Sequence, residues 1–229
     1  MSLVVDVVIP ALNEELSIGK VVGELDRKLV RHVVVVDNGS TDRTAQVAQE
    51  AGAVVLQEAQ RGYGAACLRG LAYLDKLTPA PDVVVFLDGD YADNPQELSQ
   101  LLAPIAVGSA DLVIGTRQTT ERGSLTVPQR FGNWLATLLI RWLYGYRFTD
   151  LGPFRAVTWS ALRRLQMSDR NYGWTVEMQV KAAKLGLRCQ EVPVSYRRRL
   201  GRSKVSGTLT GTVGAGYKIM YTIFKYAWS

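Results

Sequence analysis

The sequence has almost no histidine, since His32 is the only one among 229 residues. It stands directly before an apolar run, where a structural role is the simplest interpretation. Zinc sites and most nucleophile–base triads depend on imidazole groups. The scarcity of this residue argues against both classes of site.

Cysteine is also scarce, with only Cys67 and Cys189 in the whole chain. Two cysteines this far apart have neither the number nor the spacing of a disulfide framework or a metal-ligand cluster. We therefore expect two buried free thiols in a reducing compartment.

No uncharged apolar run approaches the length of about 20 residues that spans a bilayer. The longest candidates, 131–146 and 208–228, contain Arg141, Lys218 and Lys225. The first residues do not resemble a signal peptide, because an acid interrupts the apolar stretch and no basic segment precedes it. We expect a cytoplasmic protein, peripheral on the inner face of the membrane.

Acidic residues are nearly missing from the last quarter of the chain. From residue 181 onward there are ten lysines and arginines and one acid, Glu191. That excess is larger than the net charge of +6, so the first 180 residues are net negative. A basic surface favours anionic partners, and the C-terminal quarter is where we expect it.

The first half of the chain alternates strand-like and helix-like segments. Valine-rich runs predict strands at 4–9, 33–37, 53–56, 83–87 and 111–115, and helical spacing predicts helices at 15–29, 42–51, 63–77 and 95–107. Residues 119–126 and 200–207 are polar and glycine-containing, which indicates loops. This alternation predicts an α/β fold with a parallel sheet, whose ligands bind at the carboxyl ends of the strands.

Polar motifs follow the first two predicted strands. A carboxylate within Pro10-Ala11-Leu12-Asn13-Glu14-Glu15 could accept a hydrogen bond from a ribose hydroxyl, although acids are also favoured at a helix start. Asp37 closes the second strand and could accept a hydrogen bond from a base or ribose. The residues after it, 38–42, are explained by a tight turn and helix capping.

Three acids, Asp88, Asp90 and Asp93, follow the fourth strand. Carboxylates this close repel one another unless a cation lies among them, and carboxylate oxygens are the ligands that Mg²⁺ and Mn²⁺ prefer. A solvated acidic loop is the alternative. The other motifs favour the metal site.

Four motifs, PALNEE, VVVVDNGSTD, RGYGAA and FLDGDYADNP, occur in an order and spacing that resemble family 2 glycosyltransferases. The chain looks most like the dolichyl-phosphate mannose synthases and polyprenyl-phosphate glycosyltransferases, over about residues 4–205. The resemblance implies a GT-A type, Rossmann-like αβα sandwich with a mainly parallel sheet over 1–205. A C-terminal amphipathic helix over 206–229 would lie at the membrane interface.

The resemblance also implies site residues. The nucleotide-sugar pocket would be formed by Pro10, Ala11, Asn13, Glu14, Asp37, Asn38, Gly62, Asp88, Gly89, Asp90, Arg202 and Lys204. Asp88 and Asp90 would form the DxD pair on the metal, Mg²⁺ or Mn²⁺. Family members often have glutamine two residues later as a further ligand. Ala92 stands there in this chain, so Asp93 is the substitute candidate.

Five residues are candidates for the catalytic machinery: Asp90, Arg117, Arg130, Asp150 and Glu177. Arg117 and Arg130 match arginines placed near the phosphates and the acceptor, and arginine forks suit phosphate oxygens. Asp150, in a segment that resembles the acceptor element of the family, would line the acceptor pocket or act as a base. Glu177 would face the same cleft or pair with Arg155.

An apolar stripe is predicted on one helix, where Phe131, Trp134, Leu135, Leu138, Leu139, Trp142 and Leu143 recur at helical spacing. A second stripe near the C-terminus comprises Tyr217, Met220, Tyr221, Phe224 and Trp228. Aromatic side chains beside lysines suit a lipid interface. Packing against the sheet is the alternative for each stripe.

The resemblance implies an inverting, metal-dependent enzyme that transfers a sugar from a UDP- or GDP-linked donor to a polyprenyl phosphate. A same-fold enzyme with a hydroxyl acceptor and a non-catalytic nucleotide-sugar-binding protein are the alternatives. A nucleic acid partner is not expected, because the basic segment 196–204 matches no nucleic-acid motif. The sugar, the base and the oligomeric state, including a homo-oligomer, are left open.

Overall fold

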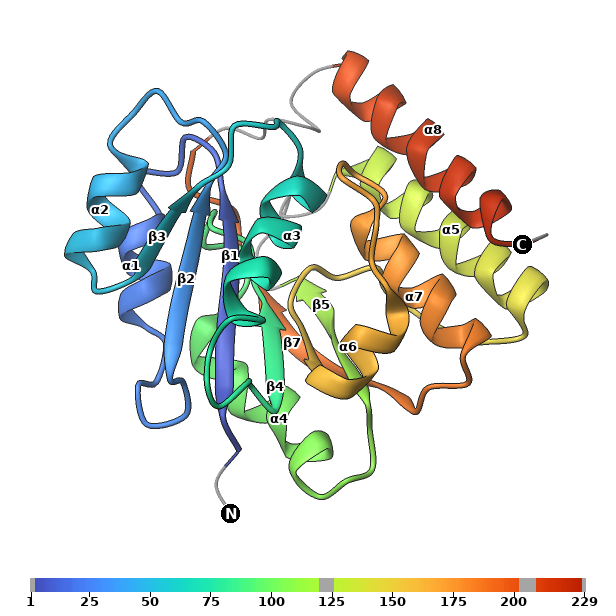
Figure 1. Ribbon diagram of the computed structural model, residues 1–229. Helices are drawn as coiled ribbons and strands as arrows, with labels where there is room; N and C mark the ends of the chain where they lie inside the picture. Colours follow the sequence, from blue (N-terminus) through green and yellow to red (C-terminus); the bar gives the residue numbers. More distant parts are fainter. Residues whose placement is uncertain (1–2, 120–125, 202–208, 228–229) are drawn as a thin grey trace.

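A seven-stranded sheet forms the centre of the molecule (Figure 1), in a computed structural model that describes residues 3–119, 126–201 and 209–227. The strand order is β3-β2-β1-β4-β6-β5-β7, and β6 runs antiparallel to both of its neighbours while the other pairs are parallel. The strands are β1 (Val5–Ala11), β2 (His32–Asp37), β3 (Val54–Gln57), β4 (Val83–Phe86), β5 (Leu112–Thr119), β6 (Arg155–Thr158) and β7 (Cys189–Tyr196).

Helices cover both faces of the sheet. One core contains side chains of α1 (Ile18–Gly23), α2 (Thr44–Glu50) and α4 (Leu98–Ala106), which follows the 3-10 turn η1 (Pro95–Glu97). The other contains side chains of α3 (Tyr63–Leu74), α5 (Val127–Tyr144), α6 (Trp159–Leu165), α7 (Trp174–Lys184) and α8 (Leu209–Lys225). The mainly parallel αβα sandwich expected from the sequence is confirmed.

The central strands are apolar on both sides because both sides are covered. In β2, Val33 and Val35 belong to one core, while Val34 and Val36 belong to the other. Successive side chains of a strand point to opposite faces, so a strand between two helical layers needs apolar residues at every position. This requirement made the central strands predictable from the sequence.

The first predicted helix, 15–29, is shorter in the structure. It is reduced to α1, and the chain from Asp26 onward forms a turn in which Leu29 N donates to Asp26 O. The side chain of Asp26 also accepts a hydrogen bond from Lys28 N at 2.9 Å. Short polar side chains that bond to the local backbone compete with the helix, which explains the early end.

Two strands were not predicted. β6 has only four residues and begins with a fully buried arginine, Arg155, so it has no apolar run that marks a strand. β7 mixes polar and apolar residues and contains Pro193, which cannot donate to a neighbouring strand. Its place at the edge of the sheet explains why proline is tolerated there.

Helices α5 and α8 lie side by side at one end of the molecule (Figure 1). Within the described residues, no helix is both long and apolar enough to cross a membrane. The division expected at residue 205 falls in the stretch 202–208, outside the described residues. It stays a prediction.

Candidate active site

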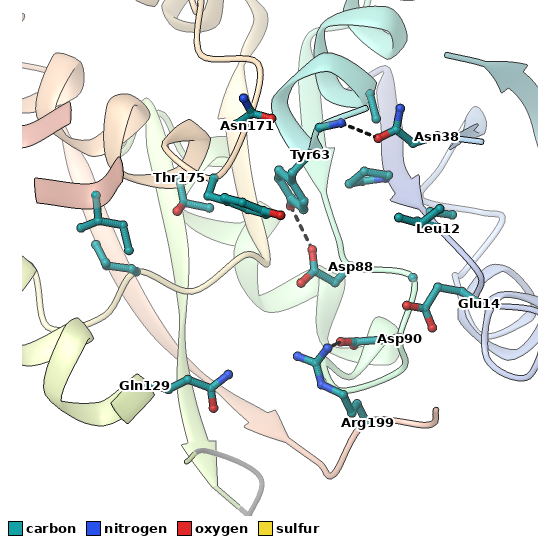
Figure 2. A pocket seen from close by; sticks show the side chains of 18 of the residues that line it. Leu12, Glu14, Asn38, Tyr63, Asp88, Asp90, Gln129, Asn171, Thr175 and Arg199 are labelled. Atoms are coloured by element: carbon teal, nitrogen blue, oxygen red, sulfur yellow. Dashed lines mark hydrogen bonds and ion pairs between the residues drawn. The ribbon is translucent and has the colours of Figure 1, made fainter. Parts of the chain in front are cut away.

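One large cavity, of about 570 Å³, opens at the carboxyl ends of the strands. Residues from the ends of β1, β2 and β4 form one side, together with Tyr63 of α3 (Tyr63–Leu74), which contacts Asp88. Residues from α5, α8 and the segment before α7 form the other side (Figure 2). Arg117 of β5 lies on this side, where its Nη2 donates to Asn133 Oδ1 of α5 at 3.3 Å. This is the position at which α/β sheets bind their ligands.

Asn38 connects the end of β2 to the start of α3. Its Oδ1 accepts a hydrogen bond from Gly62 N at 2.7 Å, and its Nδ2 donates to the carbonyl oxygens of Glu58 and Gln60. All three contacts hold the loop 58–62 against the cavity. Asn38 therefore has a structural task at the site in addition to any contact with a ligand.

The two acids of the DxD motif lie in the cavity, each with a polar partner (Figure 2). The hydroxyl of Tyr63 donates to Asp88 Oδ1 at 2.9 Å. The guanidinium of Arg199 lies 3.0 Å from Asp90 Oδ2, while Asp90 Oδ1 accepts from Ala92 N. The carboxylates are therefore held in fixed orientations at the cavity wall.

Burial and, after it, the nearby Asp90 carboxylate together raise the pKa of the Asp88 carboxyl to about 7, while the Tyr63 hydrogen bond opposes the change. Near neutral pH this carboxyl is divided between its protonated and ionised forms. A cation beside it would favour the ionised form.

The pair Asp88 and Asp90 suits a hard divalent cation. Among the described residues, no group of three or more His, Cys, Asp or Glu side chains is arranged to hold a metal ion. Mg²⁺ is often held by one or two carboxylates, with substrate phosphates and water completing its shell. Two carboxylates facing a nucleotide-sized cavity fit that mode.

Asp93, the candidate for a third ligand, is not among the residues that line the cavity. Its side chain is buried, and neither oxygen has a hydrogen-bond partner within the described part of the chain. Burial, followed by the charges of Asp88 and Asp90, raises its pKa well above the usual range. Its surroundings therefore favour the protonated form of this carboxyl over the ionised one.

Arg117 reaches the cavity from β5 and is held by Asp150. Its Nε lies 2.9 Å from Asp150 Oδ2, and its Nη2 lies 2.5 Å from Asp150 Oδ1. Burial alone would lower the pKa of Arg117, but the hydrogen bonds with Asp150 raise it overall. Asp150 is thus occupied in fixing a charged arginine, and it does not line the cavity itself.

Glu177, on α7, is fully buried and anchors the segment 168–173. Its carboxylate accepts hydrogen bonds from Ser168 N, from Asp169 N at 2.8 Å and from the Tyr226 hydroxyl at 2.7 Å. It also pairs with Lys181 at 2.8 Å. The expected alternative of a pair with Arg155 is wrong, because Arg155 donates to backbone carbonyl oxygens, among them that of Thr175.

The same segment is packed tightly against α3. Ala65 N donates to Arg170 O at 2.9 Å, and Gly64 N donates to Asn171 O at 3.3 Å. A Cβ atom at Gly64 would lie 2.0 Å from Asp169 O, so only glycine allows this approach. The contact brings Asn171 and Tyr172 into the cavity wall.

The structure brings nine of the expected site residues together at the cavity: Pro10, Ala11, Glu14, Asn38, Gly62, Asp88, Gly89, Asp90 and Arg117. Arg202 and Lys204 lie outside the described residues. The remaining expected residues do not line the cavity: Asn13, Asp37, Asp93, Arg130, Asp150 and Glu177.

Local contacts explain two of these positions, and exposure to solvent explains a third. Asn13 Oδ1 accepts from Thr41 N at 2.8 Å, and Asp37 Oδ1 accepts from Ser40 N at 3.0 Å. Both side chains therefore shape the loops after β1 and β2. Arg130 is exposed on α5.

Sequence reasoning missed several lining residues. Arg61 and Tyr63 belong to the RGYGAA motif, and Arg199 belongs to the basic segment after β7, so the motifs contained their signal. Asn171 and Ile219 carry no such signal. They reach the cavity only through the packing of the 168–173 segment and of α8.

Comparisons with known proteins show which proteins this chain is similar to. The family model described as glycosyl transferase family 2 matches residues 6–165. A glycosyltransferase of Mycobacterium tuberculosis, itself uncharacterized, is 37% identical over 91% of this chain and 93% of its own length. The undecaprenyl-phosphate mannosyltransferase of Micrococcus luteus is 33% identical over 89% of this chain and 88% of its own length.

Solved structures show the same architecture. Glucosyl-3-phosphoglycerate synthase of Mycobacterium tuberculosis, in complex with Mn²⁺, UDP-glucose and phosphoglyceric acid, superposes with a TM-score of 0.79 at 25% identity. The match covers 99% of this chain and 80% of that one. The GT-A type of fold expected from the motifs is confirmed.

Proposed function

The chain belongs to glycosyl transferase family 2, and on that premise we propose that it transfers a sugar from a nucleoside diphosphate sugar to a polyprenyl phosphate, with a divalent metal ion and with inversion. It is a glycosyltransferase, and the proposal concerns its donor, acceptor and metal. The observation that carries the proposal is a cavity with two unlike sides. Acidic strand ends form one side, and basic residues with two amphipathic helices form the other.

The acidic side is the donor side. Pro10, Ala11 and Asn38 would contact the nucleoside, and Asp88 and Asp90 would hold Mg²⁺ or Mn²⁺ with the diphosphate. The metal would neutralise charge that develops on the leaving diphosphate. Arg199 reaches the same place from the end of β7 and can donate to phosphate oxygens there. Arg202 and Lys204 remain expected contributors.

The other side suits an acceptor with a phosphate head and an apolar tail. Arg117 presents a charged guanidinium whose orientation is fixed by Asp150. Beyond it, Pro128 and Gly132 of α5 and Ile219 of α8 line the cavity. A phosphate monoester is mostly ionised at neutral pH, so it can attack without a strong general base. This fits a site in which Asp150 is already paired.

The outer surface of α5 also supports a lipid acceptor. Phe131, Trp134, Leu138 and Trp142 are all exposed, with Trp142 at 76%. Tyr217 and Tyr221 are exposed on the neighbouring helix α8. Aromatic side chains with lysines and arginines nearby favour the membrane interface. We expect this face to lie on the cytoplasmic surface of the membrane, where a polyprenyl phosphate would be reached.

A small phosphorylated hydroxyl acceptor is the second candidate. It is favoured by the likeness to glucosyl-3-phosphoglycerate synthase, which was crystallised with phosphoglyceric acid. A hydroxyl acceptor needs a base, and the two carboxylates expected for that role, Asp150 and Glu177, do not line the cavity. The lipid acceptor therefore ranks first.

A transfer assay tests both candidates. Purified protein would be incubated with labelled UDP- and GDP-sugars, Mn²⁺ or Mg²⁺, and polyprenyl phosphate in detergent, followed by organic extraction. We expect label in the organic phase that disappears when EDTA is added. Label transferred only to phosphoglycerate would establish the second candidate instead. If no donor is consumed, the alternative of a non-catalytic nucleotide-sugar-binding protein would be favoured.

Two variants control the assay. Asp90→Asn keeps the shape of the side chain but weakens metal binding, so transfer should fall by at least about a hundredfold. Asp26→Asn makes the same change at an exposed position outside the cavity and should leave transfer unchanged. Equal activity of Asp90→Asn and the wild type would reject the metal assignment.

A further inference from the structure

A second, smaller cavity lies between α8 and the segment before α7. Its volume is about 140 Å³, and Asn171 lines both this cavity and the candidate active site. The segment 168–171 therefore forms a wall of the smaller cavity, and its last residue also reaches the candidate active site. The smaller cavity is too small for a nucleotide and is of a size for a single oxyanion group.

Its walls carry three cations and one carboxylate. Lys218 pairs with that carboxylate, Asp169, at 3.0 Å. Arg170 donates to the neutral Gln60 Oε1 at 2.6 Å, and Lys225 lies 5.0 Å from the ring centroid of Tyr226. Within the described chain neither Arg170 nor Lys225 pairs with a carboxylate. Among the described residues, two of the three positive charges around the cavity therefore have no carboxylate partner.

Most of the hydroxyl groups around the cavity are already committed as donors. Ser168 and Tyr226 donate to Glu177, and Thr222 donates to Lys218 O. The donors left for a ligand are mainly those of the cations. A group with only acceptor oxygens and negative charge matches such a wall.

We propose that this cavity binds a phosphate group, of the kind carried by an anionic phospholipid headgroup. Its outer rim is formed by Tyr221, which is 48% exposed and stacks with the exposed Tyr217. Lysines beside exposed aromatic residues are the combination that anionic membrane surfaces attract. A soluble phosphate ester presents the same oxygens, so the test separates the two sources. Occupation of this site needs no sugar donor and can be measured apart from transfer.

The test uses the full chain and vesicles of phosphatidylcholine, alone or mixed with phosphatidylglycerol. The variant Arg170→Gln/Lys225→Gln removes the two charges that have no carboxylate partner among the described residues. Arg43→Gln/Lys76→Gln removes two exposed charges outside the cavity as the matched control. We expect the cavity variant to bind the mixed vesicles at least about tenfold more weakly, and the control to lose about threefold at most. Equal losses would overturn the proposal, because they would indicate general attraction to the surface.

A second arm uses glycerol 3-phosphate in solution and follows the melting temperature. A rise for the wild type and the control but not for the cavity variant supports a phosphate site. If the two variants also bind the mixed vesicles equally, the source is a soluble phosphate ester. If neither glycerol 3-phosphate nor the mixed vesicles distinguish the cavity variant from the control, no phosphate binds there.

Discussion

At the scale of single residues, the hydroxyl of Tyr63 is the contact that most directly orients the DxD motif. It donates to Asp88 Oδ1 from a position within the cavity wall. Tyr63→Phe removes one oxygen and leaves the ring in place. A hydrogen bond to a charged group contributes about 1.5–3 kcal/mol, so kcat/KM for the donor should fall by roughly 10- to 100-fold. Steady-state kinetics and calorimetric titration with UDP measure the effect.

Tyr73→Phe is the matched control, because Tyr73 lies on the same helix but does not line the cavity. It should behave as the wild type in both measurements. If Tyr63→Phe also binds and transfers normally, then Tyr63 only fills space beside Asp88.

Asp88 itself should weaken the fold while it serves the site. Its pKa is raised from the ordinary value of 3.8 to about 7. The folded state therefore binds the proton more tightly than the unfolded state, and stability is lost as the pH rises from about 4 to 7. Asp88→Asn is neutral at every pH and removes this loss. We expect it to raise the free energy of unfolding in metal-free buffer, by a few kcal/mol at pH 8 and by less at pH 5.

Urea denaturation at the two pH values checks this expectation. Asp26→Asn, at an exposed position, should show no such dependence on pH. An Asp88→Asn protein that is no more stable than the wild type at pH 8 would mean that the carboxyl is not destabilised by burial.

Breaking the pair of Arg117 and Asp150 should lower the free energy of unfolding, whereas Asp88→Asn should raise it. Asp150→Ala leaves a largely buried guanidinium without its partner, which costs about 3–5 kcal/mol. The exposed pair of Asp75 and Arg163, at 3.8 Å, is the control, and Asp75→Ala should cost less than about 1 kcal/mol. Denaturation curves measure both. Similar small losses in the two variants would show that Asp150 does not hold Arg117.

These residues also show how far the sequence could go. Strand ends and residue types indicated Asp88 and Asp90, and the family resemblance indicated Arg117; all three line the cavity. The motifs did not reveal that Asp150 binds Arg117 or that Glu177 faces away from the cavity. Such pairings depend on side chains that meet across distant segments, and the local pattern does not specify them.

At the scale of elements, the segment 168–173 links α3, α7 and α8, and Glu177 is its anchor. In Glu177→Gln the amide group faces several donors, so at least one of them is left without an acceptor. We expect a loss of about 1–3 kcal/mol and faster hydrogen exchange at Ser168 N and Asp169 N. Hydrogen–deuterium exchange measured by mass spectrometry detects both amides. Glu50→Gln, at an exposed position on α2, should change neither.

The pH dependence gives a second check. Burial would raise the pKa of Glu177, but its partners, with Lys181 first among them, lower it overall below 4.5. The stabilisation is therefore complete above 4.5 and is lost as the pH falls through the lowered value. The difference between the wild type and Glu177→Gln should shrink in that range. A difference independent of pH would contradict an ionised Glu177.

The elements that could be predicted were those with one dominant signal. The central strands carry continuous apolar runs, and α5 (Val127–Tyr144) contains the residues of the apolar stripe that the sequence predicted. β6 and β7 had no such signal, because their positions depend on neighbours from distant parts of the chain. These two segments form strands because they pair with neighbouring strands in the sheet.

At the scale of the whole molecule, the candidate active site is assembled from segments spread over the chain. Residues from Pro10 to Ile219 meet at one cavity. The strand ends could be foreseen, since all parallel strands end at the same edge of the sheet. The contribution of α8 could not be foreseen, because its position depends on tertiary contacts with α5 and α7 that the local sequence does not specify.

At the same scale, the apolar face of α5 exposes large hydrophobic side chains to water, which is energetically unfavourable. Leu138 and Trp142 are exposed there, well along the helix from the cavity-lining residues. If this face inserts into a membrane interface, Leu138→Ser/Trp142→Ser should weaken vesicle binding by about tenfold. Transfer to detergent-dispersed acceptor should be retained. Val107→Ser, also at an exposed position but at the end of α4, should leave binding unchanged.

The alternative partner for this face is a second copy of the chain, and flotation and light scattering together distinguish the two. Weaker flotation of Leu138→Ser/Trp142→Ser, with no change in mass in solution, assigns the face to lipid. Unchanged flotation, with a dimer that dissociates in the same variant, assigns it to an interface between copies. The chemistry of the face favours lipid, because Lys218 lies over the ring of Tyr221. Cations next to aromatic rings interact favourably with phosphate headgroups, whereas they would repel the same positively charged surface on a second copy of the chain.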